Sequence, residues 1–183
     1  MRLAPLTADQ WDDAATRAVA DFLPEERRNA RDAGNLLATL ARHPELCRAF
    51  LRFSGYLLTR STLSPRLREL VVLRIAHRRN CAYEWNHHVD IGKRVGLSDA
   101  DIAAAQTGAA ADEFDRVVLG AVDELDEQTN LSDHTWAALA EQLDEKQLMD
   151  FIFTVGGYAA LAMGLNTFGV EVEAGRHGAD TER

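Results

Sequence analysis

The sequence is short of cysteine, and this scarcity narrows the class of protein. Cys47 and Cys81 are the only two cysteines among 183 residues, too few for a framework of disulfide bonds. The chain does not open with the charged, apolar and small-residue pattern of a secretory signal. We therefore expect a cytoplasmic protein in a reducing compartment.

Positive charge is also scarce. Lys and Arg number 20 against 29 Asp and Glu, which gives a formal net charge of −9. Binding to nucleic acid, or to an anionic membrane surface, needs clustered positive charge in excess. The composition therefore disfavours nucleic-acid and membrane partners and leaves a small-molecule substrate as the expected ligand.

Long apolar runs are absent with one exception, the segment from Phe151 to Val170, which carries no charged residue. Its length is about one membrane thickness of helix. Four glycines, Asn166 and two threonines dilute its hydrophobicity, and acidic residues flank it on both sides. We interpret it as a buried core helix of a protein that does not enter a membrane.

Helix-start signals recur along the chain. Thr7, Ser98 and Asp144 are each followed three residues later by an acid or an amide, which is the pattern of a capping box. Ser64 stands before a proline, the residue type favoured at the first helical position. The first helix of the chain is therefore expected to begin after Thr7.

Apolar residues between these signals repeat with the period of a helix, and period-2 alternation of β-branched residues is almost absent. The pattern predicts an all-α bundle. With 183 residues and 46% hydrophobic residues, the chain can form one domain, or a core with an N-terminal extension. The expected helices cover residues 7–22, 36–40, 46–57, 64–79, 81–95, 98–106, 114–125, 136–143 and 144–170.

The stretch from Asn80 to His88 contains several residues whose side chains could take part in catalysis. On a helix, Cys81, Glu84 and His88 fall at i, i+3 and i+7 and share one face. Glu69 precedes Cys81 by twelve residues. A thiol, carboxylates and an imidazole on one face can form an acid/base or nucleophilic site, because imidazole titrates near neutrality and burial tunes the others.

The spacing of Glu69, Cys81, Glu84 and His88 resembles that of the carboxymuconolactone decarboxylase and alkylhydroperoxidase D superfamily. Glu84 stands where the peroxidase members carry their second cysteine. The run Tyr83-Glu84-Trp85, followed by His88, is similar to the decarboxylase-like branch, and so is the segment 166–169, Asn-Thr-Phe-Gly. The resemblance therefore points to the decarboxylase-like branch more than to the dithiol peroxidases.

The resemblance implies a domain organisation and an assembly. Residues 40–172 would form the helical family domain, residues 1–39 an N-terminal helical extension, and residues 173–183 a polar tail. Family members commonly assemble as trimers or hexamers of helical subunits. We therefore expect a homo-oligomer with a single-domain helical bundle of the alkylhydroperoxidase D-like type in each subunit.

Each motif residue receives an expected role, beside a purely structural alternative. His88 is the expected proton donor, and Glu84, four residues before it, would orient its imidazole; the alternative is an ion pair on the helix surface. Glu69 would be a second acid/base group with a raised pKa, or would face solvent beside Arg68. Cys81 is either a reactive thiol or a small buried hydrophobic residue.

The surroundings of the motif add candidate binding residues. Arg74 and Arg78 belong to a local cluster of positive charge that would suit a substrate carboxylate. The alternative is a solvated helix face, which most clusters of positive charge are. Tyr83 is a candidate for contact with substrate, with packing in the core or at a subunit interface as the alternative. His77 and His88 are about 16 Å apart along a helix axis, too far to share one ion. We therefore expect no metal and no cofactor.

Three hypotheses about function follow. The first is a cofactor-independent lyase of the carboxymuconolactone decarboxylase type, acting on a small carboxylated lactone or a related acid. The second is an antioxidant thiol peroxidase that uses Cys81 alone and therefore needs an external thiol. The third is a helical oligomer that binds a ligand without catalysis. A buried pocket of perturbed ionisable groups would favour an enzyme.

Overall fold

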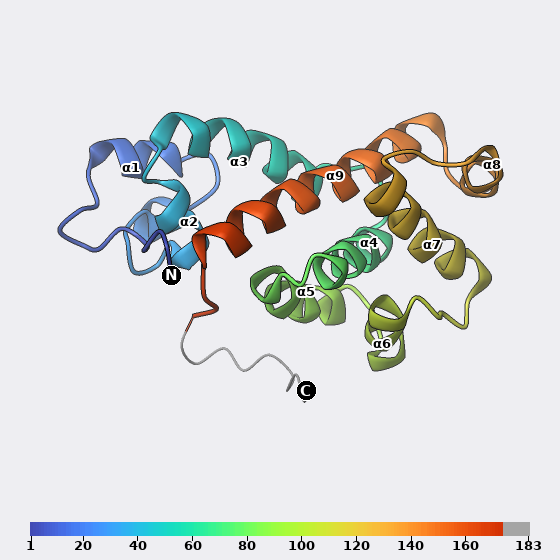
Figure 1. The fold of residues 1–183 in the computed structure, drawn as a ribbon. Helices are drawn as coiled ribbons and strands as arrows, with labels where there is room; N and C mark the ends of the chain where they lie inside the picture. Colours follow the sequence, from blue (N-terminus) through green and yellow to red (C-terminus); the bar gives the residue numbers. More distant parts are fainter. Residues whose placement is uncertain (174–183) are drawn as a thin grey trace. The chain divides into compact units, whose positions relative to one another are not determined.

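The computed structural model of the protein describes residues 1–173, and these residues contain helices and no strand. The all-α prediction is confirmed. The helices, labelled in Figure 1, are α1 (Asp13–Ala18), η1 (Glu25–Arg27), α2 (Gly34–Leu40), α3 (Pro44–Thr59), α4 (Pro65–Arg78), α5 (Ala82–Arg94), α6 (Asp99–Thr107), α7 (Glu113–Gln128), α8 (Asp133–Ala140) and α9 (Glu145–Phe168).

The described residues divide into two compact units. Residues 1–60 and 164–173 form one unit, and residues 61–163 form the other. The predicted boundary at residue 39 concerns the extent of the family domain and stays a prediction. The predicted polar tail, 173–183, lies outside the described residues except for its first member.

The first unit has a small core built by α1, α2 and α3. Its buried residues include Val19, Leu37, Leu51 and Cys47, whose thiol is fully buried among them. Thr7 does not start a helix, contrary to the prediction. It makes the expected bond with the Gln10 side chain, but the backbone forms only a turn there, and α1 begins after the Asp12 cap.

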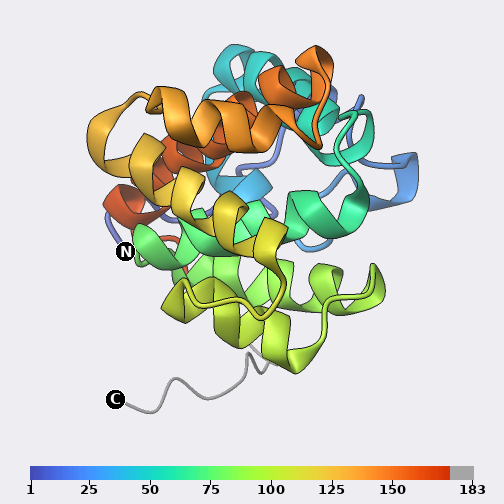
Figure 2. The ribbon, with the colours of Figure 1, turned by 90° about the vertical axis from the view of Figure 1, so that its right-hand side faces the viewer.

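Helix α4 is the centre of the second unit. It contacts α5, α6 and α7, and the last of these, yellow in Figure 2, runs next to the green α4. All ten residues from Leu67 to Ala76 are buried, charged ones included. Its N-terminus is capped by Ser64, as predicted. A helix enclosed in this way holds its polar side chains in a nearly water-free environment.

A tight connection joins α4 to α5. Asn80 has φ of 50°, a left-handed conformation that ends α4, and Cys81 then caps α5. The separation of the predicted helices 64–79 and 81–95 is thus confirmed. Gly96, with φ of 99°, follows the end of α5 as expected. Gly92 permits close packing, because a Cβ there would lie 2.8 Å from Leu97 Cδ1.

Helix α9 has 24 residues and is the one helix among residues 1–173 that is long and apolar enough to cross a membrane. Half of its most apolar 18-residue stretch is buried inside the protein. The core helix of a water-soluble protein has the same properties, and this is how we interpret α9. Its start is fixed by the predicted cap, since Asp144 and Gln147 exchange side-chain to backbone hydrogen bonds.

Candidate active site

The side chains of Glu69 on α4 and His88 on α5 meet in the interior of the second unit. His88 Nδ1 lies 2.6 Å from Glu69 Oε2, and both residues are buried. The contact depends on the close packing of α4 against α5. Two residues that are 19 positions apart in the sequence therefore form a hydrogen-bonded dyad.

Arg68 completes this arrangement from the neighbouring position on α4. Its Nε donates to Glu69 Oε1 over 2.9 Å, so each carboxylate oxygen of Glu69 has its own partner. Burial alone would raise the pKa of Glu69, but the hydrogen bond with His88 and the charge of Arg68 outweigh it, and the pKa is lowered. The predicted raised pKa is wrong because the prediction did not include these partners.

Glu84 lies on α5, one turn before His88, but it is not the group that is hydrogen-bonded to the imidazole. Glu84 is 2% exposed, and neither of its carboxyl oxygens has a hydrogen-bond partner among residues 1–173. Burial raises the pKa of Glu84 to about 8, opposed weakly by the nearby Cys81 thiol. Glu84 is therefore mostly a neutral carboxylic acid at pH 7. The carboxylate hydrogen-bonded to His88 is that of Glu69, and Glu84 does not have the predicted position.

Cys81 is buried at the N-cap of α5. Burial and the nearby Glu84 carboxyl raise the pKa of the Cys81 thiol to about 12. A thiol with this pKa contains almost no thiolate at neutral pH, and the thiolate is the form that reacts with peroxides. The structure thus places Cys81 beside Glu84 as a neutral thiol.

Tyr158 of α9 is a site residue that the sequence analysis missed. Its ring meets the His88 ring edge to face, with 5.0 Å between centroids and 89° between planes. Burial, followed by the charges of Glu69 and Glu84, raises the pKa of Tyr158, so its hydroxyl stays neutral. No signal near the motif could identify it, because Tyr158 is 70 residues from His88 in the sequence.

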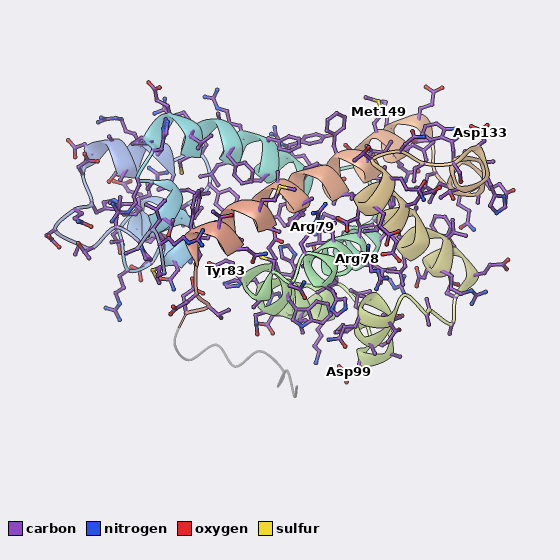
Figure 3. The ribbon with its side chains drawn as sticks, in the orientation of Figure 1. Arg78, Arg79, Tyr83, Asp99, Asp133 and Met149 are labelled. Atoms are coloured by element: carbon purple, nitrogen blue, oxygen red, sulfur yellow. The ribbon has the colours of Figure 1, made fainter. Side chains whose placement is uncertain are left out.

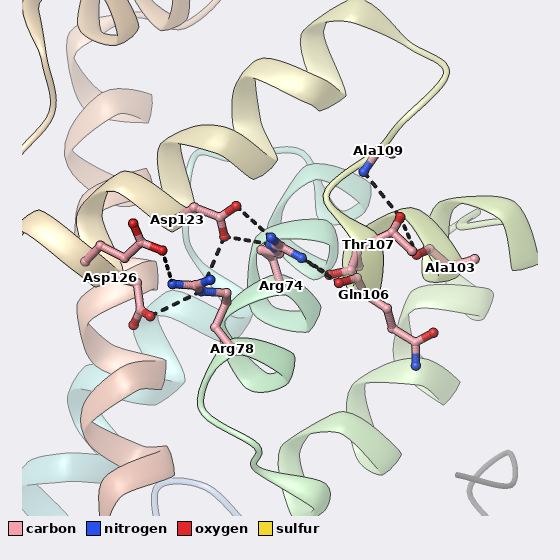
Figure 4. A network of polar contacts seen from close by, with 10 residues as sticks. Arg74, Arg78, Ala103, Gln106, Thr107, Ala109, Asp123 and Asp126 are labelled. Carbon is pink, nitrogen blue, oxygen red and sulfur yellow. Dashed lines mark hydrogen bonds and ion pairs between the residues drawn. The ribbon is translucent and has the colours of Figure 1, made fainter. Parts of the chain in front are cut away.

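The predicted binding residues Arg74 and Arg78 do not join the dyad. Arg74 donates two hydrogen bonds to Asp123, 2.6 and 2.7 Å long, and two more to the carbonyls of Ala105 and Gln106 (Figure 4). Arg78, labelled in Figure 3 near the end of α4, pairs with acidic residues of α7. Their local positive charge is thus neutralised by α7, and the prediction that they hold substrate has no support in this geometry.

Tyr83 and His77, the remaining candidates, also have partners outside the dyad. The Tyr83 ring stacks on His87 of the same helix, with 4.2 Å between centroids, and the His77 ring meets Trp85 edge to face. Within residues 1–173, no group of three or more His, Cys, Asp or Glu side chains has a geometry that could hold a metal ion. The imidazole and carboxyl groups of the site are side chains that can transfer protons.

The fold and the site together define an all-helical protein with a buried acid/base cluster. The carboxymuconolactone decarboxylase family matches residues 44–127, the part of the chain that contains Glu69, Cys81, Glu84 and His88. This match supports the superfamily that the motif predicts. No curated protein sequence matches it.

Solved structures with the same fold include three that cover nearly the whole chain. A peroxidase-related protein from Silicibacter sp. TM1040 has a TM-score of 0.77 and 16% identity, covering 97% of this chain and 96% of its own. An alkylhydroperoxidase AhpD core protein from Ralstonia eutropha JMP134 has a TM-score of 0.75 and 16% identity, covering 95% and 94%. The debrominase Bmp8, in complex with 2,3,4-tribromopyrrole, has a TM-score of 0.72 and 16% identity, covering 95% and 92%. At these identities the likeness establishes the fold.

Proposed function

We propose that this protein is a cofactor-independent acid/base enzyme of the decarboxylase-like branch, acting on a small carboxylated lactone or a related acid. The observation that carries the proposal is the buried His88–Glu69 dyad, 2.6 Å between Nδ1 and Oε2, beside the partnerless carboxyl of Glu84. Neighbouring groups whose pKa values are pushed in opposite directions are the usual arrangement for acid/base catalysis. Here the pKa of Glu69 is lowered and that of Glu84 is raised.

Glu69 would set the working form of the imidazole. Because the Glu69 carboxylate is ionised and accepts a hydrogen bond, Nδ1 of His88 carries the donating hydrogen. The other ring nitrogen, Nε2, is then the atom that gives or takes a proton. This role matches the predicted proton donor, with Glu69 in the orienting position.

Glu84 would supply the second function of the site. When the carbon–carbon bond to the substrate carboxylate breaks, its electron pair moves into the conjugated lactone carbonyl, and carbon dioxide leaves. A neutral Glu84 can donate a hydrogen bond to the enolate oxygen that forms. The proton on His88 Nε2 then passes to the carbon that lost carbon dioxide, which restores the carbonyl and returns a neutral imidazole.

Replacing His88 tests this proposal. A general acid typically contributes about a hundred- to ten-thousand-fold in rate, so His88→Ala should lower turnover of a carboxylated lactone by that order. Carbon dioxide release by wild type and variant, assayed over a panel of small carboxylated lactones, measures the effect. His87→Ala, on the same helix but outside the dyad, is the matched control and should retain turnover.

Two results would favour the alternative hypotheses. Equal turnover by wild type and His88→Ala would remove His88 from the mechanism, and no turnover by either would favour a non-catalytic binding module. Rapid reduction of an alkyl hydroperoxide that Cys81→Ser abolishes would favour a thiol peroxidase. The buried, neutral Cys81 thiol and the glutamate at position 84 speak against that second outcome.

A further inference from the structure

We propose that Arg68 is the residue that holds the substrate carboxylate. This assignment rests on the proposed function, since it assumes a carboxylated substrate. Arg68 is the guanidinium in direct contact with the dyad, through its bond to Glu69. The arginines that the sequence suggested for this task, Arg74 and Arg78, are bound to α7 instead.

The hydrogen-bonding capacity of Arg68 is only partly used. Its Nε donates to Glu69, and its two terminal nitrogens make no hydrogen bond to any group within residues 1–173. A guanidinium binds a carboxylate best through two parallel N–H groups, and the terminal pair offers such an edge. Arg74 provides the contrast, because all three of its nitrogens already have acceptors.

Glu69 gives the guanidinium and the imidazole a shared support. Its Oε1 accepts from Arg68 and its Oε2 contacts His88, so a single carboxylate orients both side chains. A substrate carboxylate bound at the free edge of Arg68 would thus be held by a guanidinium that is fixed by Glu69, the residue that also orients the proton donor. Arg68 and His88 can then act on two parts of one small molecule.

The electrostatics of the cluster also suit one added anion. The charge of Glu69 is balanced by Arg68. The raised pKa values of Glu84, Cys81 and Tyr158 leave these three groups mostly neutral at pH 7. A substrate carboxylate would therefore meet little repulsion from its neighbours and would gain an ion pair in a poorly hydrated environment.

Binding of two matched probes separates this role from catalysis. Furan-2-carboxylate and furan-2-carboxamide share ring and shape, and only the first carries a charge. We expect wild type to prefer the carboxylate in calorimetric titrations, and Arg68→Gln to lose at least about tenfold of that preference, the loss typical of a charge-assisted bidentate contact. Arg68→Lys, which keeps the charge without the paired geometry, should lose less.

Arg78→Gln is the matched control and should leave the preference unchanged, because Arg78 pairs with α7. Probe binding and turnover of a carboxylated lactone are measured separately, so failure of this inference is distinguishable from failure of the proposed function. Circular dichroism checks that each variant is folded. The inference is overturned if folded Arg68→Gln and Arg68→Lys keep the full preference, or if wild type shows none with furan-2-carboxylate up to roughly 10 mM, a weak-binding limit.

Discussion

Glu84 is the residue whose ionisation should give the stability of this protein a distinctive pH dependence. Its pKa is raised from 4.5 to about 8 by burial. Below pH 4.5 the carboxyl is protonated in both folded and unfolded chains and costs nothing. Between pH 4.5 and 8 only the unfolded chain ionises, so stability falls as the pH rises. Above pH 8 the cost no longer grows.

Glu84→Gln should remove this cost. At pH 8 we expect the variant to be more stable than wild type by on the order of 2–4 kcal/mol, and at pH 5 by well under half of that, since one pKa unit corresponds to about 1.4 kcal/mol. Urea unfolding at the two pH values measures the difference. The exposed Glu141→Gln is the control and should show no such trend. A stability gain that is equal at both pH values would contradict a raised pKa for Glu84.

At the scale of single residues, the sequence predicted which side chains lie in the same part of the fold better than it predicted their pairing. Glu69, Cys81, Glu84 and His88 were identified from their spacing, and the structure places them within one unit. Glu84 was expected to orient His88 because the two are four residues apart on one helix. The hydrogen-bond partner of His88 is Glu69, because α4 packs against α5. The spacing of residues along one helix does not predict which other helix packs against it.

At the scale of elements, Arg74 ties α4 to α6 and α7 through four hydrogen bonds. Arg74→Met would leave Asp123 and two backbone carbonyls without their donor, so we expect a loss of stability of about 3 kcal/mol, as for a broken buried ion pair. Denaturant unfolding measures it. The Arg78 side chain is 28% exposed against 8% for Arg74, so Arg78→Met should cost under about 1 kcal/mol. Equal losses in both variants would contradict a special role for Arg74.

Helix boundaries were predicted well where the sequence contains a capping residue or a helix-breaking residue. Ser64, Ser98 and Asp144 precede helices, and Asn80 separates α4 from α5. Thr7 has the same capping pattern without a helix directly after it. The residues that follow it give only weak apolar periodicity, and a short helix is stabilised mainly by the face that it can bury. A capping pattern alone is therefore insufficient to predict that a helix starts at a residue.

The whole molecule is expected to self-associate, and α9 supplies a surface for this. The side chain of Met149, labelled in Figure 3, is 60% exposed, and those of Phe153 and Met163 are each 54% exposed. Gly156 and Ala160 are exposed between them. These five residues follow one another at intervals of four, three, four and three, which is the heptad spacing of paired helices. The small residues at 156 and 160 would let a second helix approach closely.

We call these five residues of α9 the α9 seam. We expect the α9 seam to pair with the α9 seam of a second copy, as in a two-fold symmetric contact. Ala160→Glu places a charge at its centre, and burying two such charges face to face is costly. Light scattering should therefore show an oligomer for wild type and a smaller species for Ala160→Glu. Ala103→Glu, an identical change at an exposed position of α6, is the control and should leave the size unchanged. A monomeric wild type would refute self-association, and an Ala160→Glu protein of unchanged size would place the contact on another surface.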